Sequence, residues 1–204
     1  NAADGQSLID TLDISLSEVQ SILLRMRELT IQAISDTNSA ADRLALDSEL
    51  SQLELEITRI GSTTSFGGKP VFDGNLHYLQ IGPRSGNTLE VQAYTLSAST
   101  LGLTQDLTTR NNAENYLGII DTAIEDINEK RGAAGALSNR LDFIMSNLDN
   151  SKVNLIKSRS TIEDADFAAE SMKLAKAKIL EQVAIAMIAQ ANARTQWILK
   201  LLEN

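Results

Sequence analysis

The sequence of 204 residues lacks cysteine altogether and contains only two prolines, one histidine and 4% aromatic residues. Without cysteine, the chain can form neither a disulfide nor a thiolate metal site. Two prolines leave room for long helices, because a proline in a helix interior costs roughly 3 kcal/mol. The single histidine, His77, has no carboxylate at ligand spacing within "GNLHYLQ". We therefore interpret His77 as a surface residue, and we predict no catalytic residue, no metal site and no cofactor.

The charge of the chain restricts its partners. Its formal net charge is −9 at pH 7, whereas nucleic acids and anionic membranes attract basic surfaces. No run approaches the ~20 apolar residues of a membrane-spanning helix. Apolar residues make up 43% of the chain and are mainly leucine, isoleucine and alanine. This composition is typical of helices that pack on other helices, and it argues against a nucleic-acid or membrane partner.

Two stretches near the start of the chain have apolar residues in steps of three and four, the spacing of helices that pack along one seam. The apolar positions are Leu8, Leu12, Leu16, Val19, Leu23 and Met26, and then Leu46, Leu50, Leu53, Ile57 and Ile60. They predict helices over residues 4–34 and 41–60. The polar residues 35–43 predict a loop between them, so the two helices form an antiparallel hairpin. Gly61 follows in the position of a C-terminal helix cap.

Residues 62–103 differ from the rest of the chain. They contain six of the eleven glycines and both prolines. Two alternating runs, "LHYLQIG" and "NTLEVQAYTL", flank the turn signal "PRSGN" at residues 83–87. This pattern predicts a β-hairpin, within an otherwise helical chain.

A third heptad frame predicts a helix over residues 111–158. Its positions are Leu117, Ile120, Ile124, Ile127, Arg131, Ala134, Leu141, Leu148 and Leu155. Gly132 and Gly135 lie inside this frame, although each costs about 1 kcal/mol relative to alanine in a helix interior. Either the helix breaks there or a neighbour packs close against it. The continuous frame favours close packing.

A further helix is predicted from Ala165 to about Leu202, and it carries a wide apolar stripe. The stripe residues are Ile179, Leu180, Val183, Met187, Ile188, Ala191, Ile198 and Leu201. A single helix cannot bury such a face on itself, and the rest of the chain offers no free partner. We therefore expect part of the core to lie in other molecules or in sequence outside this chain.

Between these two helices, "RSTIEDADFAAE" at residues 159–170 places three acids close together. As a metal site, this cluster lacks the alternating acidic pattern and the closing glutamate of a calcium loop. As an acid–base pair, it lacks pocket-forming aromatic residues. A serine or threonine followed by an acid three residues later matches a capping box, and first-turn acids suit the helix dipole. We therefore interpret the cluster as a cap and joint between two helices, made by Ser160, Thr161, Glu163, Asp164 and Asp166.

Four stretches, in this order and at these separations, resemble bacterial flagellin, the subunit family of the flagellar filament. They are "LLRMRELTIQA", "ELSQLELEITRIGSTTSFGGKPVFDG", "SRSTIEDADFAAE" and "KILEQVAIAMIAQANARTQWILKLL". The most specific is the "IEDADFA" joint followed by the "AQAN" helix and the apolar "ILKLL" end. By this resemblance, the conserved N-terminal arm and the large outer domains of the family are missing from the sequence.

The resemblance implies a mainly α fold: an elongated antiparallel helical bundle or coiled-coil rod with a small β-hairpin segment, plus a long C-terminal helix. Residues 1–162 correspond to the outer-core rod of the family. Residues 163–204 correspond to the inner-core helix, which pairs in the family with the missing N-terminal helix. The implied function is that of a structural, non-enzymatic subunit that self-assembles through helical seams for motility. The implied location is extracellular, after export by the flagellar type III pathway without a cleaved signal peptide.

The resemblance also implies partners: other flagellin subunits, an export chaperone, the filament cap, the hook-junction proteins and an innate-immune receptor. The residues that match the receptor motif are Arg25, Leu29, Gln32, Glu56 and Arg59. Leu53, Leu55 and Thr58 depart from the commoner, more polar pattern. The same surface would contact neighbouring subunits. The apolar stripe would serve inner-core packing or docking of the export chaperone.

Two alternatives stand beside this interpretation. The hook–filament junction protein belongs to the same superfamily and shares the terminal helices. A secreted enzyme or ligand-binding module on a flagellin-like scaffold would use the acidic joint as its site. The complete "SRSTIEDADFA" joint and the short middle segment favour a flagellin.

Overall fold

The computed structural model describes residues 1–202, with all side chains except those of residues 165–166 and 199–202. Within this range the elements are α1 (Ala2–Ile34), α2 (Ala40–Thr63), β1 (Ser65–Phe66), β2 (Lys69–Pro70), β3 (Leu76–Gln80), β4 (Thr88–Gln92) and α3 (Arg110–Leu202). The chain divides into two compact units: unit 1 is Asn1–Leu148, and unit 2 begins at Asp149. The first part of α3 belongs to unit 1 and the rest forms unit 2. The mainly α fold with small antiparallel strand pairs is as predicted.

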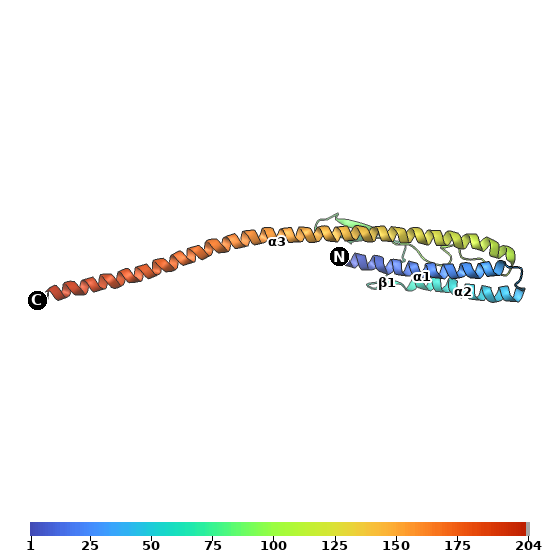
Figure 1. Cartoon of the computed structure of the whole chain (residues 1–204), viewed down its shortest axis with the longest axis horizontal. Helices are drawn as coiled ribbons and strands as arrows, with labels where there is room; N and C mark the ends of the chain where they lie inside the picture. The colour runs from blue at the N-terminus through green and yellow to red at the C-terminus, as the bar shows by residue number, and fades with distance from the viewer. Residues whose placement is uncertain (203–204) are drawn as a thin grey trace. The chain divides into compact units, whose positions relative to one another are not determined.

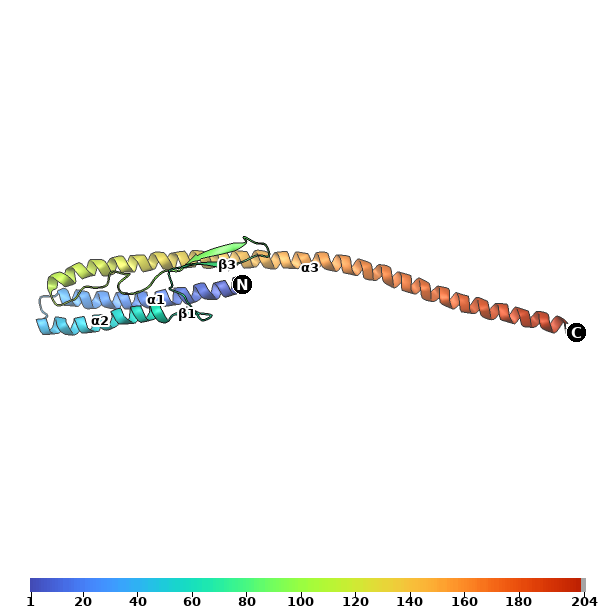
Figure 2. The ribbon, with the colours of Figure 1, turned by 180° about the vertical axis from the view of Figure 1, so that it is seen from behind.

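In unit 1, α1, α2 and the first part of α3 run alongside one another (Figures 1 and 2). The heptad seam of α1 forms the centre of this bundle, and its residues Leu12, Leu16, Val19, Leu23 and Met26 are all buried. The predicted period is therefore confirmed, because one side of α1 faces both neighbouring helices along its length.

A capping box fixes the start of α2. The side chain of Ser39 accepts a hydrogen bond from the Asp42 amide (3.2 Å), and the Asp42 carboxylate accepts one from the Ser39 amide (2.9 Å). Two backbone N–H donors at the start of the helix are thereby satisfied. This cap ends the α1–α2 loop and allows the chain to reverse direction within five residues, 35–39.

Polar pairs join α1 to α3 beside the apolar seam. Arg27 Nε lies 2.7 Å from Asp121 Oδ1, and Arg131 Nε lies 2.9 Å from Asp13 Oδ1. Arg131 also donates to Gln20 Oε1 at 2.6 Å. Arg131 occupies an apolar position of the heptad frame, and its charge is matched by a carboxylate of the facing helix.

The predicted β-hairpin is confirmed as β3 and β4. The two strands pair antiparallel, from Leu76 opposite Gln92 to Gln80 opposite Thr88. Alternate residues of β4, Leu89 and Val91, enter the core. Leu96, Leu103 and Leu107 from the segment after β4 are also buried, although no periodic pattern in the sequence marks them.

The interpretation of Gly61 as a helix cap is wrong. α2 continues to Thr63, and Gly61 is buried without a positive φ. A Cβ atom at this position would overlap the backbone carbonyl of Leu96. Gly61 is therefore a site of close backbone approach between α2 and the segment after β4.

The prediction of close packing at Gly132 and Gly135 is also wrong. α3 passes through both glycines without a break, yet a Cβ atom at either position would meet nothing within 4 Å. No neighbour among the described residues accounts for them. They are exposed positions at which alanine would fit.

Candidate interaction surfaces

The acidic cluster at residues 159–170 lies inside a helix, so the predicted cap and joint are wrong. α3 continues from Arg110 to Leu202, instead of ending near residue 158 and restarting. Ser160 donates to Asp164 Oδ2 (2.8 Å), and Thr161 donates to the carbonyl of Lys157 (3.0 Å). Arg159 pairs with Glu163 at 2.7 Å. These contacts span four residues, the spacing of neighbours on a helix surface.

The side chain of Asp166, the fifth residue of that prediction, lies outside the described side chains. The continuity of the helix has a physical reason. Neither glycine nor proline occurs after Gly135, so nothing in the sequence breaks the helix at residue 160. A serine or threonine followed three or four residues later by an acid also fits a helix interior, where the two side chains are neighbours.

His77 is half-buried in unit 1 and not simply at the surface. Its Nε2 lies 3.1 Å from Oδ1 of Asp73, four residues earlier and just outside the stretch considered for ligands. Hydrogen bonds from Asn75, with a smaller effect from His77, hold the pKa of the Asp73 carboxyl below its ordinary value. No group of three or more potential metal-binding side chains occurs among the described residues, and no helix there has the length and hydropathy that spanning a bilayer requires.

Charged residues of α1 and α2 form one surface of unit 1, which we call the α1–α2 polar surface. Arg25 on α1 bridges to Glu49 on α2 (2.8 Å) and to Glu28 (3.1 Å). Glu56 and Arg59 pair with each other on α2 at 2.6 Å. The bond from Arg59 lowers the pKa of the Glu56 carboxyl. Water and salt screen such exposed pairs, so they add little to stability, and their side chains can exchange partners.

Four of the five residues predicted for this surface do reach solvent. Arg25, Gln32 and Arg59 are exposed, and Glu56 is half-exposed. Leu29 is only 2% exposed, because it points into the seam of α1. Leu29 therefore acts in unit 1 as a core residue and cannot contact a partner from its observed position, which corrects the predicted surface.

A partly buried polar pair joins α2 to α3 and was not predicted. Tyr116 is fully buried, and its hydroxyl donates to Glu54 Oε1 at 2.5 Å. Burial raises the pKa of the Glu54 carboxyl, the bond from Tyr116 partly offsets that rise, and the negative charge of Asp47 adds to it. Asp47 itself accepts a hydrogen bond from the amide of Leu107 (2.8 Å). No sequence motif links these residues, which lie far apart in the chain.

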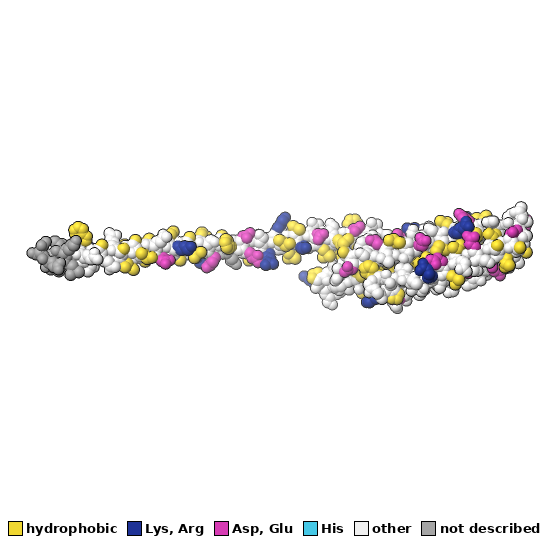
Figure 3. All heavy atoms as spheres, turned by 90° about the horizontal axis from the view of Figure 1, so that it is seen from below, with side chains coloured by type: hydrophobic (Ala, Val, Ile, Leu, Met, Phe, Trp, Pro, Cys, Tyr) yellow, Lys and Arg dark blue, Asp and Glu magenta, His cyan; other side chains and the backbone are white. Residues whose placement is uncertain are grey.

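In unit 2, every described side chain from Asp149 to Ile198 is exposed. The predicted stripe residues that are described are Ile179, Leu180, Val183, Met187, Ile188, Ala191 and Ile198, and we call them the unit 2 stripe. Leu180 is 59% exposed and Met187 is 64% exposed. Leu201 belongs to the same prediction, but its side chain lies outside the described ones. Figure 3 shows hydrophobic side chains exposed along this helix, with acidic and basic ones among them.

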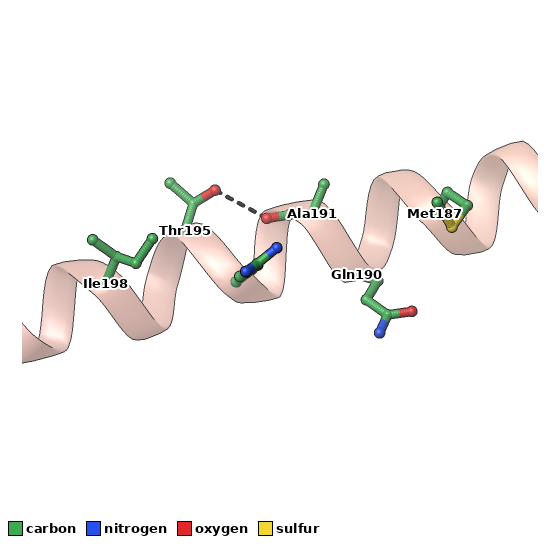
Figure 4. A pocket seen from close by; sticks show the side chains of 6 residues that line it. Met187, Gln190, Ala191, Thr195 and Ile198 are labelled. Atoms are coloured by element: carbon green, nitrogen blue, oxygen red, sulfur yellow. Dashed lines mark hydrogen bonds between the residues drawn. The ribbon is translucent and has the colours of Figure 1, made fainter.

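The hollow that Figure 4 shows on unit 2 lies along one helix. Its lining residues are Met187, Gln190, Ala191, Arg194, Thr195 and Ile198. The hydroxyl of Thr195 donates to the carbonyl of Ala191 at 2.9 Å, so it is already satisfied within the helix. A hollow bounded by one helix is an open face, and it needs a partner to become a site. The hollow is thus an open face of one helix and not an enclosed pocket.

Comparison with known proteins gives matches over both ends of the chain. A profile described as the bacterial flagellin N-terminal helical region matches residues 1–77, and one described as the bacterial flagellin C-terminal helical region matches residues 117–202. A flagellin of Halalkalibacterium halodurans is 39% identical over 99% of this chain and 76% of its own length. A flagellin of Bacillus subtilis is 33% identical over 99% of this chain and 79% of its own length.

Among solved structures, the crystal structure of Bacillus cereus flagellin has a TM-score of 0.66. It is 36% identical and covers 72% of this chain and 87% of its own. The crystal structure of Bacillus cereus FlgL has a TM-score of 0.59 at 16% identity, covering 76% of this chain and 89% of its own, and it shows the fold alone.

Proposed function

The chain belongs to the bacterial flagellin family, and from that premise we propose that it is a structural subunit of a flagellar filament, held there by other subunits. The observation that carries the proposal is the unit 2 stripe. A helix with seven exposed apolar residues on one side is poorly suited to water, and isolated helices gain most of their stability from packing. Assembly with other copies supplies that packing. Nothing in the described residues favours the hook-junction alternative or an enzyme.

We assign residues 163–204 to the inner core of the filament, and residues 1–162 to the outer core. This division follows the resemblance to the family; the first compact unit ends at Leu148, and residues 149–162 are as exposed as the described side chains assigned to the inner core. The export route, through the flagellar type III pathway without a cleaved signal peptide, belongs to the same proposal. So do contacts with the filament cap and with the hook-junction proteins.

The test of the proposed function changes the stripe in the chromosomal gene. Leu180→Asp together with Met187→Asp places two carboxylates where an apolar partner has to pack, at a cost of several kcal/mol if both are buried. We expect electron microscopy to show few or no filaments, and motility to be lost. Gln182→Asp with Gln196→Asp is the matched control, because it makes the same change in net charge and both residues lie on the other side of the same helix. Normal filaments in the stripe variant would refute the proposal.

The same stripe is our proposed docking surface for the export chaperone. Its apolar residues are accessible before assembly, when no other subunit covers them. Calorimetry with the purified chaperone should show weaker binding for the Leu180→Asp, Met187→Asp variant than for the control pair. Subunits found in the culture medium but not in filaments would place the defect in assembly, and subunits retained in the cell would place it in export.

The α1–α2 polar surface is our proposed contact with neighbouring subunits and with the innate-immune receptor. Arg25, Gln32, Glu56 and Arg59 support this, because they match the receptor motif and reach solvent. Receptor-bearing reporter cells should respond at least several-fold less to Arg25→Ala with Arg59→Ala than to the unchanged chain. Lys69→Ala, in β2, serves as the control. An unchanged response would remove the receptor from the list of partners.

A further inference from the structure

Three cations lie on the same side of α3 as the unit 2 stripe: Lys173 and Lys176 precede the stripe, and Arg194 lies within its span. Steps of three and four residues counted from Met187 reach the positions Lys173, Lys176, Leu180, Val183, Met187, Gln190, Arg194 and Trp197. We call these eight positions the unit 2 frame. Residues at this spacing lie along one side of a helix. A partner helix that runs along this side from Lys176 to Arg194 therefore covers both cations together with Leu180, Val183 and Met187.

The unit 2 frame has no carboxylate of its own between residues 173 and 197. Glu170 and Glu181 lie on one flank, about 100–120° around the helix from Met187. Lys173 Nζ is 3.3 Å from Glu170 Oε2, but both side chains are 75% exposed, so this pair contributes little. Among the described side chains, no carboxylate lies within 4.0 Å of the cationic groups of Lys176 or Arg194.

In unit 1, a cation at a comparable position of a helix frame has its carboxylate partner. Arg131 occupies a position of the α3 frame, and Asp13 of α1 meets its guanidinium across the seam at 2.9 Å. Gln20 of the same helix accepts a second bond from it. The chain thus already pairs a cation on a helix frame with a carboxylate of the facing helix.

We propose that unit 2 selects a helix whose apolar stripe carries carboxylates opposite Lys173, Lys176 and Arg194. This rests on the proposed function, in which the stripe is covered. An uncharged apolar partner would bury Lys176 and Arg194 without counter-charges, and that is costly. In coiled coils, a polar or charged residue at a core position fixes the register and the choice of partner. Lys176 and Arg194 are 18 residues apart, or about 27 Å along the helix, so the facing carboxylates need the same separation.

An anionic membrane is the less favoured partner. In helices that lie on membranes, cations flank the apolar side and reach outward to the headgroups. Here Lys176 and Arg194 occupy the apolar side itself, and Glu163, Glu170 and Glu181 follow one flank. These glutamates would face the anionic headgroups and repel them. The charge pattern therefore fits a facing helix better than a lipid surface.

The test uses the full chain and two synthetic helical peptides of about 28 residues that share one leucine stripe. One peptide carries glutamate at the three positions that face the cations, and the other carries lysine there. Trp197 is the single tryptophan, lies on the unit 2 frame and is 72% exposed, so its fluorescence reports binding. We expect the glutamate peptide to bind at least tenfold more tightly at low salt. The ratio should shrink as salt screens the charges.

Charge reversal completes the test. Lys173→Glu, Lys176→Glu and Arg194→Glu together should reverse the preference, so that the lysine peptide binds more tightly. The control is Lys152→Glu, Lys157→Glu and Lys178→Glu, which makes the same change in net charge off the unit 2 frame and should leave the preference intact. Equal affinity for both peptides, binding of neither, an unreversed preference, or tighter binding to phosphatidylglycerol vesicles would each overturn the inference. If filaments are lost in the Leu180→Asp, Met187→Asp strain while the peptides show no charge preference, only this inference fails.

Discussion

Replacing Tyr116 with phenylalanine removes a single hydroxyl from the interior of unit 1. The ring of Tyr116 is fully buried between α3 and α2, and phenylalanine keeps that packing. What is lost is the hydrogen bond to Glu54 Oε1, 2.5 Å away. A hydrogen bond to a charged group contributes about 1.5–3 kcal/mol. Because Glu54 is only half-buried and water can replace part of the bond, we expect a loss of about 1.5–2 kcal/mol at pH 7.

The loss should depend on pH in a definite direction. Burial raises the pKa of Glu54 in the folded chain above its unfolded value. The stability that this group contributes is therefore complete below the unfolded pKa and disappears as the pH rises through the folded pKa. Without the donor of Tyr116, the folded pKa of Glu54 rises further. The penalty of Tyr116→Phe is thus largest at neutral pH and shrinks as the pH falls toward about 4.

Thermal unfolding followed by circular dichroism at pH 7 and at pH 4.5 measures this penalty. For a unit of about 150 residues, the expected loss lowers the midpoint of its cooperative transition by about 3–8 °C at pH 7. In a Glu54→Gln background the same substitution should cost clearly less. Tyr78→Phe is the control, because Tyr78 is 61% exposed and its hydroxyl has no hydrogen bond within the described residues. A Tyr116→Phe shift no larger than that of Tyr78→Phe would refute the reasoning.

Two further predictions concern the backbone of unit 1. Gly132→Ala and Gly135→Ala should each raise the free energy of unfolding by about 0.5–1 kcal/mol, since the added methyl group meets open space. Gly61→Ala should lower the free energy of unfolding, because its Cβ atom overlaps a backbone carbonyl. Thermal unfolding of the three variants distinguishes the two outcomes. Ser39→Ala should cost about 1 kcal/mol at pH 7. Ser39 lowers the pKa of Asp42 in the folded chain, so the contribution of the cap is present above the pKa of Asp42 in the unfolded chain and is lost as the pH falls through its folded pKa. Urea titrations should therefore show a smaller cost of Ser39→Ala at pH 3 than at pH 7. An equal cost at both pH values would contradict the cap.

Heptad spacing predicted the helices of unit 1 because their core residues repeat with the period of the helix. Leu16, Leu23 and Ile57 are all buried, as the steps of three and four require. Some of the residues that the spacing missed enter the core from irregular backbone. Leu103 and Leu107 have no periodic neighbours, and only the path of the chain after β4 brings them under α2 and α3. Sequence periodicity carries no information about such a path.

Local sequence patterns also gave wrong predictions where one residue type has two structural roles. Gly61 fitted a helix cap, but glycine equally permits close backbone approach, and the neighbouring segment decides between the two. Ser160 and Asp164 fitted a cap, but the same spacing pairs side chains within a helix. Tyr116 and Glu54 gave no signal, because their bond depends on the register between α2 and α3. These choices are made by tertiary contacts and not by the local sequence.

Periodicity has a different value in unit 2, where every described side chain of the frame is exposed. Hydropathy alone describes Leu180, Val183 and Met187 as an apolar surface. It predicts only that the partner is apolar. Lys176 and Arg194 contradict that simple description, because burying them unpaired would cost more than a few buried methyl groups return. In unit 1 the corresponding exception, Arg131, is explained by the carboxylate of Asp13. The residues that fit the stripe least are therefore the ones that say most about what covers it.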